Sequence, residues 1–493
     1  MTARLRGERG NALFGVIVGF AAGVLVAALV VPDRGSSSVL AGGSGGSAGG
    51  TAGGGALVVG PGQGPSSEGG AVSGGGGAGP DSGSTTEGSA GQDGGAAVDG
   101  GPVRGVTDDK IRIGIALLEL GALKNLGPSF DNGDRRQHFE SILDGWRQRG
   151  LVPIHGRDVE FVYRSYGPIS PEEQRAACKG LVQDENVFMV IADSTFNAGI
   201  ECVTREFRTL LVTSDAPPDD VFQRGAPYVF TLQPSLGRTL RNYVHWAHHR
   251  GALSGKKIGL YYFDDAVTRD LMDRTVKAEL SNLGYSVAAE QTTTQNLGGP
   301  ADALAVQRFR TAGVDVAMLF TSKAGFMQNA QAQAYRPAYL ENDFLSGTTN
   351  TATSTYPAEQ FDGTYGMSGM RYGEWKAGLP TPAEAEACLA DYERFSGKRI
   401  DPNAREAEYV GLNKGCDDAR LVIQALQGAG PGLTPAGVVA QLELLQGVTM
   451  GVHGVVSFGA GKHDGIDQHR TVQWTADCKC WKALGSFEPL FVP

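Results

Sequence analysis

The sequence predicts an α/β body made of two lobes in series, preceded by an apolar segment and a glycine-rich linker. Three observations support this fold class. Strand and helix patterns alternate from about Val106 onward, and the alternation restarts after Pro234. Several apolar strands also end abruptly in small polar residues. Alternating β and α units give mostly parallel sheets with helices on both faces.

The first lobe begins with the strand-like run IRIGIALL at 111–118. A helix is predicted over 135–149 because its apolar residues recur at helical spacing. Ser170, followed by proline and two glutamates, is typical of a capped helix start. The remaining predicted elements of this lobe are strands at 159–163, 187–191 and 209–213 and a helix around Cys202.

The second lobe repeats the pattern and is followed by two longer helices and a β-rich end. Its predicted strands are 257–263, 286–290, 314–321 and 343–345. Its predicted helices are 236–250, 268–283, 301–312 and 324–334, with further helices at 382–396 and 404–427.

Small polar side chains follow strands in both lobes. They include Asp193-Ser194-Thr195, Ser214-Asp215-Ala216, Asp264-Asp265, Thr321-Ser322-Lys323 and 346–350. One such residue after a strand is ordinarily just a helix N-cap. Ligands of open parallel sheets, however, bind beyond the carboxyl ends of the strands. The recurrence in both lobes therefore predicts a ligand site to which each lobe contributes.

The first 34 residues contain a stretch without charges, Ala12 to Val31, preceded by Arg4, Arg6 and Arg9. Twenty helical residues span ~30 Å, the thickness of a hydrocarbon core. The arginines place residues 1–11 in the cytoplasm and the body outside, as a single-pass membrane protein. The alternative is a signal peptide cleaved after Ala41, but the apolar run is longer than usual for one.

Residues 32–105 are rich in glycine, serine and alanine, and predict a disordered spacer between the membrane segment and the body at 106–493. The chain of 493 residues has a formal net charge of −10 and a pI of about 5.4. This acidic charge balance does not indicate a protein that binds nucleic acid.

The six cysteines all lie in the body, and an even number outside the cytoplasm indicates disulfides. A bond between Cys478 and Cys480 is difficult in a straight strand. Residues two apart there are separated by ~6.6 Å, which is near the upper limit for the Cα atoms of a disulfide. Either the chain bends there or these two cysteines pair elsewhere.

Several segments then make the body resemble the solute-binding proteins of ABC importers in the type I, branched-chain amino-acid-binding family. They are GVTDDKIRIGIALL, VFMVIADSTFNAGIECVTREFRTLLVTSDAP, EYVGLNKGCDDARLVIQAL and GVVSFGAGKHDGIDQHRTVQW, which span about 107–485. The resemblance implies two Rossmann-like lobes joined by three crossovers. The first lobe would comprise about 107–232 and 369–454, and the second about 233–368 and 455–493.

The resemblance also assigns residues. The ligand loops of the first lobe fall on Ser194 and Thr195 and on Ser214, Asp215 and Ala216. In the second lobe, family aromatic residues fall near Ser322 and near Ala266 or Val267, and the acid that neutralises a ligand ammonium group falls near Thr348. Asp264, Asp265 and Lys323 complete the predicted ligand-binding set. Cys178–Cys202, where the family often has a disulfide, and Cys388–Cys416 are the predicted pairs.

Thr348 cannot supply a charge, so an α-ammonium group would need another anionic partner. Lys323 suits a carboxylate, and the predicted ligand class is therefore an amino acid, amide or organic acid. The partner implied is an ABC permease in the same membrane, with no cofactor.

Other chemistry is disfavoured. His245 and His249 lie four apart on a predicted helix without a third metal ligand nearby, and His463, Asp464, Asp467 and His469 crowd a predicted turn. No sequence motif of a nucleophilic or metallohydrolase site occurs. A sensor or scaffold of the same fold is the main alternative to transport, and a hydrolase is a weaker one.

Overall fold

The computed structural model describes residues 103–121, 130–168, 170–294, 299–321, 323–371 and 373–492. The predicted membrane segment at 12–31, and the linker at 32–105 except its last three residues, lie outside these ranges. Within the described ranges, no helix is both long and apolar enough to cross a membrane.

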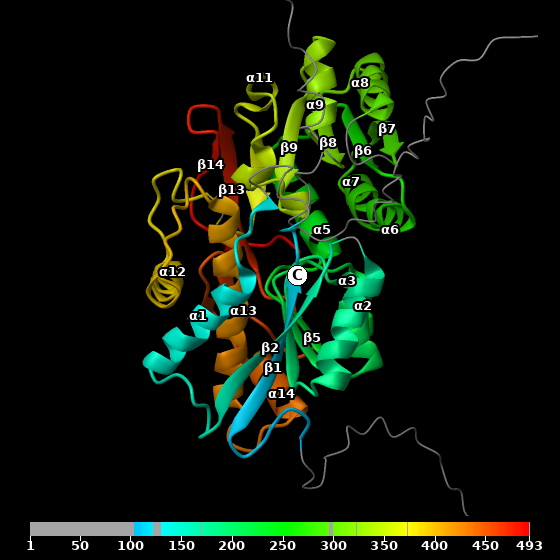
Figure 1. Ribbon diagram of the computed structural model, residues 1–493. Coiled ribbons are helices and arrows are strands. Elements are labelled where there is room, and N and C mark those ends of the chain that lie inside the picture. Colours follow the sequence, from blue (N-terminus) through cyan, green and yellow to red (C-terminus); the bar gives the residue numbers. More distant parts are fainter. Residues whose placement is uncertain are drawn as a thin grey trace, which may run out of the picture. The chain divides into compact units, whose positions relative to one another are not determined.

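The first sheet has five parallel strands in the order β2-β1-β3-β4-β5 (Figure 1). Its strands are β1 (Lys110–Leu118), β2 (Asp158–Tyr166), β3 (Met189–Ala192), β4 (Leu210–Thr213) and β5 (Val229–Thr231). Side chains of β1 alternate between two cores, as a strand buried on both faces requires. Ile111, Ile113 and Ile115 enter one core, and Ala116 and Leu118 enter the other.

Helices cover both faces of this sheet, and we call the sheet with these helices the first lobe. One face packs against α1 (Arg135–Gln148), α12 (Ala383–Ser396), α13 (Glu406–Gly428) and α14 (Pro435–Leu444). The other packs against α2 (Pro171–Lys179) with η3 (Gly180–Asp184), α3 (Asn197–Glu201) with η4 (Cys202–Glu206), and α4 (Asp219–Gly225). Ser170 caps α2 as predicted, since its hydroxyl accepts from the amide of Glu173.

The second sheet is mixed, which corrects the prediction of two parallel sheets. Its parallel strands are β6 (Ile258–Phe263), β7 (Val287–Thr293), β8 (Val316–Phe320), β9 (Ala338–Asn342) and β10 (Tyr365–Ser368). Three antiparallel strands extend it: β13 (Gln468–Thr475), β14 (Cys480–Ala483) and β15 (Glu488–Pro489). A short turn joins β13 to β14, as an antiparallel pair allows, whereas a parallel pair needs a long crossover. The strand β13 is also antiparallel to β10, although the chain passes through the first lobe between these two strands.

Helices also cover both faces of the second sheet, and together they form the second lobe. One face packs against α5 (Leu236–His249) and the continuous run α6 (Ala266–Leu271), η5 (Met272–Lys277) and α7 (Ala278–Asn282). The other packs against α8 (Pro300–Ala312), α9 (Lys323–Ala332) and α11 (Ala358–Phe361). The short elements η6 (Phe344–Ser346) and α10 (Asn350–Thr353) connect β9 to α11.

The predicted strand at 343–345 is wrong. The strand β9 ends at Asn342, and Phe344 and Leu345 lie in the helical turn η6 with their side chains buried in the core. The strand β9 was not predicted at its true position because it ends in the polar residues Glu341 and Asn342, which interrupt the apolar pattern although both are buried. The short strands β5 and β10 were not predicted either.

The chain passes between the two sheets after β5, after β10, and again between the small pair β11 (Val448–Thr449)–β12 (Val455–Val456) and β13. The first and third of these crossovers pair directly. The amide of Gly465 donates to the carbonyl of Thr231 at 2.8 Å, and that of Ile466 to the carbonyl of Leu232 at 3.0 Å.

A buried ion pair reinforces these backbone contacts. Arg238 Nη1 donates to Asp464 Oδ1 at 3.1 Å, and both side chains are under 10% exposed. The other oxygen of Asp464 accepts from the amide of Ser235 at 3.1 Å. The second crossover is held separately, because Asp343 Oδ2 accepts from the amide of Gly369 at 2.8 Å.

All six cysteines are paired. The predicted disulfides Cys178–Cys202 and Cys388–Cys416 are both present, and a third joins Cys478 to Cys480. Of the two alternatives that the sequence left open, the chain adopts the bend, with Lys479 at φ 50°.

Replacing Asp464 by alanine tests the role of the buried pair. The change leaves the Arg238 guanidinium with one partner fewer in a buried site and removes the acceptor of the Ser235 amide. We expect a loss of about 3–5 kcal/mol in the free energy of unfolding, measured by urea denaturation.

The matched control is Asp467→Ala. Asp467 also contacts Arg238, at 2.6 Å, but its side chain is 37% exposed. This variant should lose under about 1 kcal/mol, as solvent-screened pairs do. Equal losses in the two variants would contradict the account.

Candidate functional site

The residues predicted for the first lobe meet at one edge of its sheet. The strands β3 and β4 are parallel neighbours with Ala192 opposite Thr213, so the residues that follow them lie side by side. The amide of Thr195 donates to Asp215 Oδ2 at 2.7 Å and joins the two loops directly. Thr195 has φ 64°, a left-handed conformation that β-branched residues rarely adopt.

These loop residues are more buried than the sequence suggested. Ser194, Thr195, Ser214, Asp215 and Ala216 are each under 9% exposed. Tyr166 Oη donates to the carbonyl of Ser194 at 2.7 Å, so β2 also holds this loop in place.

Behind the first loop lies a charged cluster that sequence reasoning missed. Arg135 Nε donates to Asp193 Oδ2 at 2.8 Å, and both side chains are under 10% exposed. Arg135 Nη1 lies 3.2 Å from His138 Nδ1, and His138 Nε2 lies 3.6 Å from a carboxylate oxygen of Glu408. Burial lowers the pKa of His138. Asp193 is thus already neutralised by Arg135.

The second loop is held from behind by α13. Ser214 Oγ donates to Asp418 Oδ2 at 3.0 Å, and Gln233 Nε2 donates to the Ser214 carbonyl at 2.5 Å. Burial raises the pKa of Asp418 well above its usual value. Ser214 therefore fixes the loop, which leaves Asp215 and Ala216 as the residues that the loop carries at its tip.

In the second lobe, the two aspartates after β6 directly precede α6. The carboxylate of Asp264 forms an ion pair with Arg269. Asp265 caps α6, because its carboxylate accepts from the amide of Thr268 at 2.8 Å. The predicted residue Ser322 lies outside the described residues.

Lys323, predicted as a partner for an anion, forms an ion pair with Glu341 instead. The two side chains are 2% and 1% exposed, so the pair is fully buried. A Cβ atom at Gly347 would lie 2.3 Å from Glu341 Oε2 and 2.6 Å from Lys323 Nζ. Only glycine fits there, and the segment 346–350 passes directly over the pair.

Thr348 contacts an acidic residue, Asp343, that sequence analysis did not identify as part of the site. Its hydroxyl donates to Asp343, which also accepts from Ser368 Oγ at 2.7 Å. Burial raises the pKa of Asp343. A carboxyl group therefore lies next to Thr348, where the sequence pattern had placed none.

Two of the four histidines considered as metal ligands contact a glutamate instead. His245 Nε2 lies 3.2 Å from Glu279, and His463 Nε2 lies 2.8 Å from Glu443. In the part of the chain that the structure describes, no three histidine, cysteine, aspartate or glutamate side chains are grouped to hold a metal ion.

Comparison with protein families matches residues 110–479 to a family described as periplasmic binding protein. A search of curated proteins finds no match.

Solved structures share the fold at low sequence identity. A solute-binding protein of an ABC transporter from R. palustris, in complex with 4-hydroxybenzoate, is 17% identical with a TM-score of 0.59, and the match covers 78% of this chain and 98% of that one. A branched-chain amino acid ABC transporter protein from Thermus thermophilus with bound valine is 15% identical with a TM-score of 0.59, covering 77% and 97%. A leucine-binding protein from Thermotoga maritima is 13% identical with a TM-score of 0.57, covering 77% and 99%.

The Lys323–Glu341 pair gives a pH-dependent prediction. Burial raises the pKa of Glu341 from 4.5 to about 7, although Lys323 opposes the shift. The folded chain therefore binds this proton more tightly than the unfolded chain, and the contribution of Glu341 to stability falls as the pH rises from about 4.5 to about 7. Replacing Lys323 by methionine removes the opposing charge and enlarges that loss.

We expect Lys323→Met to lower the free energy of unfolding by about 3–5 kcal/mol at pH 8 and by clearly less at pH 5, where Glu341 is protonated. The control is the double variant Lys323→Met/Glu341→Gln, which carries no buried charge and should recover most of the stability at pH 8. Urea unfolding at both pH values measures this, and an equal loss at pH 5 and pH 8 would contradict it.

Proposed function

The chain belongs to the periplasmic binding protein family, and we propose that it is an extracytoplasmic solute-binding protein that captures a small polar molecule between its two lobes. One observation carries the proposal. The loops after β3 and β4 meet at the carboxyl edge of the first sheet and are joined by the contact of Thr195 with Asp215. Open parallel sheets bind ligands at such an edge.

The first-lobe face of the proposed site comes from Ser194, Thr195, Ser214, Asp215 and Ala216. In this proposal Ser194, Thr195 and Asp215 offer hydrogen bonds to the solute, and Ser214 shapes its loop through Asp418. The second-lobe face comes from the residues after β6, β8 and β9, with Asp264, Asp265, Ser322, Lys323 and Thr348 as its proposed members. Lys323 acts there mainly by supporting the segment 346–350 over the buried pair.

The proposed ligand is an amino acid, an amide or an organic acid. Two buried charges near the faces are already compensated, Asp193 by Arg135 and Lys323 by Glu341. Directed hydrogen bonds rather than net charge would then select the solute. The ligands in two solved neighbours, 4-hydroxybenzoate and valine, support a small-molecule ligand.

In this proposal the N-terminal segment holds the protein in the cell membrane, and the linker lets the body reach an ABC permease in the same membrane. The binding of solute would close the two lobes about the crossovers, as in other hinged binding proteins. Nothing in the charge balance or in the family suggests a nucleic-acid partner or a catalytic role.

Thermal denaturation of the protein against a library of amino acids, amides, organic acids, short peptides and sugars tests the binding role. A ligand that binds only the folded state raises the melting temperature by mass action. We expect one chemical class to raise it and the variants Ser194→Ala and Asp215→Asn to weaken its binding at least about tenfold, or ~1.4 kcal/mol.

The matched control is Asp144→Asn on the exposed side of α1, which should leave the affinity unchanged. Asp144 is 47% exposed and forms an ion pair with Arg147 at 3.2 Å. A melting temperature that no compound raises, or a ligand whose affinity Asp215→Asn does not change, would contradict the proposal.

Analysis of the exported protein tests the anchor. We expect the mature chain to retain residues 12–31 and to sediment with membranes, because the apolar run is long enough to span the hydrocarbon core. N-terminal sequencing would instead begin at Gly42 if the segment were a signal peptide cleaved after Ala41. A Val39→Ala variant, which completes an Ala-Leu-Ala cleavage site, serves as a positive control for release.

A further inference from the structure

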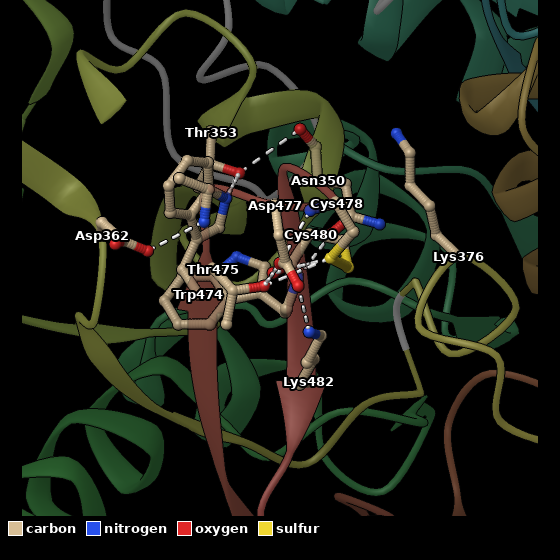
Figure 2. The surroundings of a disulfide bond; sticks show 12 residues. Asn350, Thr353, Asp362, Lys376, Trp474, Thr475, Asp477, Cys478, Cys480 and Lys482 are labelled. Carbon is tan, nitrogen blue, oxygen red and sulfur yellow. Dashed lines mark hydrogen bonds and ion pairs between the residues drawn. A yellow bond between two sulfur atoms is a disulfide. The ribbon is translucent and has the colours of Figure 1, made fainter. Parts of the chain in front are cut away.

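The disulfide between Cys478 and Cys480 lies at the turn between β13 and β14 (Figure 2). Only Lys479 separates the two cysteines, and their Cα atoms are 5.2 Å apart. Lys479 takes φ 50°, in the left-handed region that L-residues other than glycine, asparagine and aspartate seldom occupy. The bond therefore encloses one exposed lysine in an unfavourable backbone conformation.

The two sulfur atoms differ in their access to solvent. Cys480 is fully buried, whereas Cys478 is partly exposed and is followed by the exposed Lys479. Cys178 and Cys202 are both fully buried. Cys478 is therefore the residue through which a thiolate from solution would approach its bond, whereas both residues of the Cys178–Cys202 bond are buried in the folded chain. In the Cys388–Cys416 bond, Cys388 is buried and Cys416 is partly exposed.

The bond also contributes little to the fold that surrounds it. A disulfide restrains the unfolded chain more as its loop grows, and the separation of 2 residues here compares with 24 and 28 for the other two bonds. Backbone pairing of Trp474 with Trp481 and of Val472 with Ala483 holds the hairpin independently of the sulfur atoms. The hairpin should therefore persist when the bond opens.

Side chains at the turn are placed to accommodate a reduced Cys478. Thr475 Oγ1 lies 3.2 Å from Cys478 Sγ and donates its proton to Asp477 Oδ1, so the hydroxyl has to rotate to donate to a Cys478 thiolate. Asp477 Oδ1 accepts from the Cys478 amide at 2.7 Å, and its other oxygen contacts Lys482 Nζ at 2.8 Å. These contacts connect the residues of the turn to one another; Figure 2 shows them gathered around the bond.

We propose that Cys478–Cys480 is a thiol–disulfide exchange site that accepts electrons from a dithiol reductant. A thiolate of the reductant attacks Cys478 Sγ, forms a mixed disulfide there and expels the Cys480 thiolate, which takes a proton. The second thiolate of the reductant then attacks the reductant's own sulfur in that mixed disulfide and releases Cys478 as a thiolate, which takes the second proton. The reductant is oxidised to a disulfide, and the two cysteines gain two electrons and two protons.

The exchange site borders the proposed second-lobe face. The amide of Trp481, the residue after Cys480, donates to Asn350 Oδ1 at 2.9 Å. Asn350 begins α10, two residues after Thr348. The location of the reductant, on the extracytoplasmic side, rests on the proposed function, but the chemical test below does not require a solute.

The full chain in detergent is treated with increasing dithiothreitol, without denaturant, and free thiols are trapped with N-ethylmaleimide. Trypsin cuts after Arg470, Lys479 and Lys482, so Cys478 and Cys480 fall on separate peptides, 471–479 and 480–482. Mass spectrometry then counts the label at each cysteine. We expect both peptides to be labelled at a dithiothreitol concentration at least tenfold below that needed for Cys178–Cys202 or Cys388–Cys416.

Oxidised glutathione added to the reduced site should form its first mixed disulfide on peptide 471–479. Two matched variants assign the attacked sulfur: Cys480→Ser leaves a thiol at Cys478 and should be alkylated at least tenfold faster than Cys478→Ser, which leaves only the buried Cys480. Far-ultraviolet circular dichroism should remain unchanged after selective reduction.

The proposal is overturned if Cys388–Cys416, whose Cys416 lines a surface groove of about 290 Å³, is reduced at the same or a lower concentration. It is also overturned if the two single-cysteine variants react at equal rates, or if labelling of 478 and 480 requires denaturant. None of these results bears on solute binding, which is measured separately.

Discussion

The buried ion pair between Arg238 and Asp464 is the contact on which the rest of the body depends. It fastens the start of α5 to the segment that leads into β13, and the backbone bonds of Thr231 and Leu232 with 465–466 close around it. A buried pair of this kind contributes more as more of its remaining donors and acceptors are satisfied. Here Ser235, Asp467 and the carbonyl of Ile466 supply partners, and among the donors of Arg238 the Nε atom is left without one. The first and third crossovers are thus fixed to one another, while the second is held by Asp343.

The same logic applies at the proposed binding faces. Each lobe keeps its strongest charges compensated inside the protein, Arg135 with Asp193 in the first and Lys323 with Glu341 in the second. The small polar residues carried on top of these pairs are thereby left to make hydrogen bonds of defined direction. The buried pair of Lys323 and Glu341 also restricts position 347 to glycine, because any side chain there would collide with the pair. Specificity would then reside in the shape and hydrogen bonding of loops that rigid charged clusters hold in place.

Local sequence patterns predicted much of the secondary structure, but they did not predict the contacts between side chains that are distant in the sequence. The strand-like run IRIGIALL at 111–118 predicted β1, and the hydroxyl cap at Ser170 predicted the start of α2. The partners of the candidate residues could not be read in the same way, because Arg135 and Asp193 are 58 residues apart and Ser214 and Asp418 are 204 apart. The strand β9 was misplaced because burial of Glu341 depends on Lys323, a partner that periodicity does not reveal. Whether Cys478 and Cys480 bond depended on the backbone of Lys479, which composition leaves open.

Amide hydrogen exchange of the full chain, with and without a solute that raises its melting temperature, tests the central claim most directly. If the solute is held between the two lobes, protection should rise together in 193–197, in 214–216 and in 346–350, segments that belong to both sheets. Protection confined to one lobe, or found only away from these three segments, would contradict a binding site built from the strand ends of both.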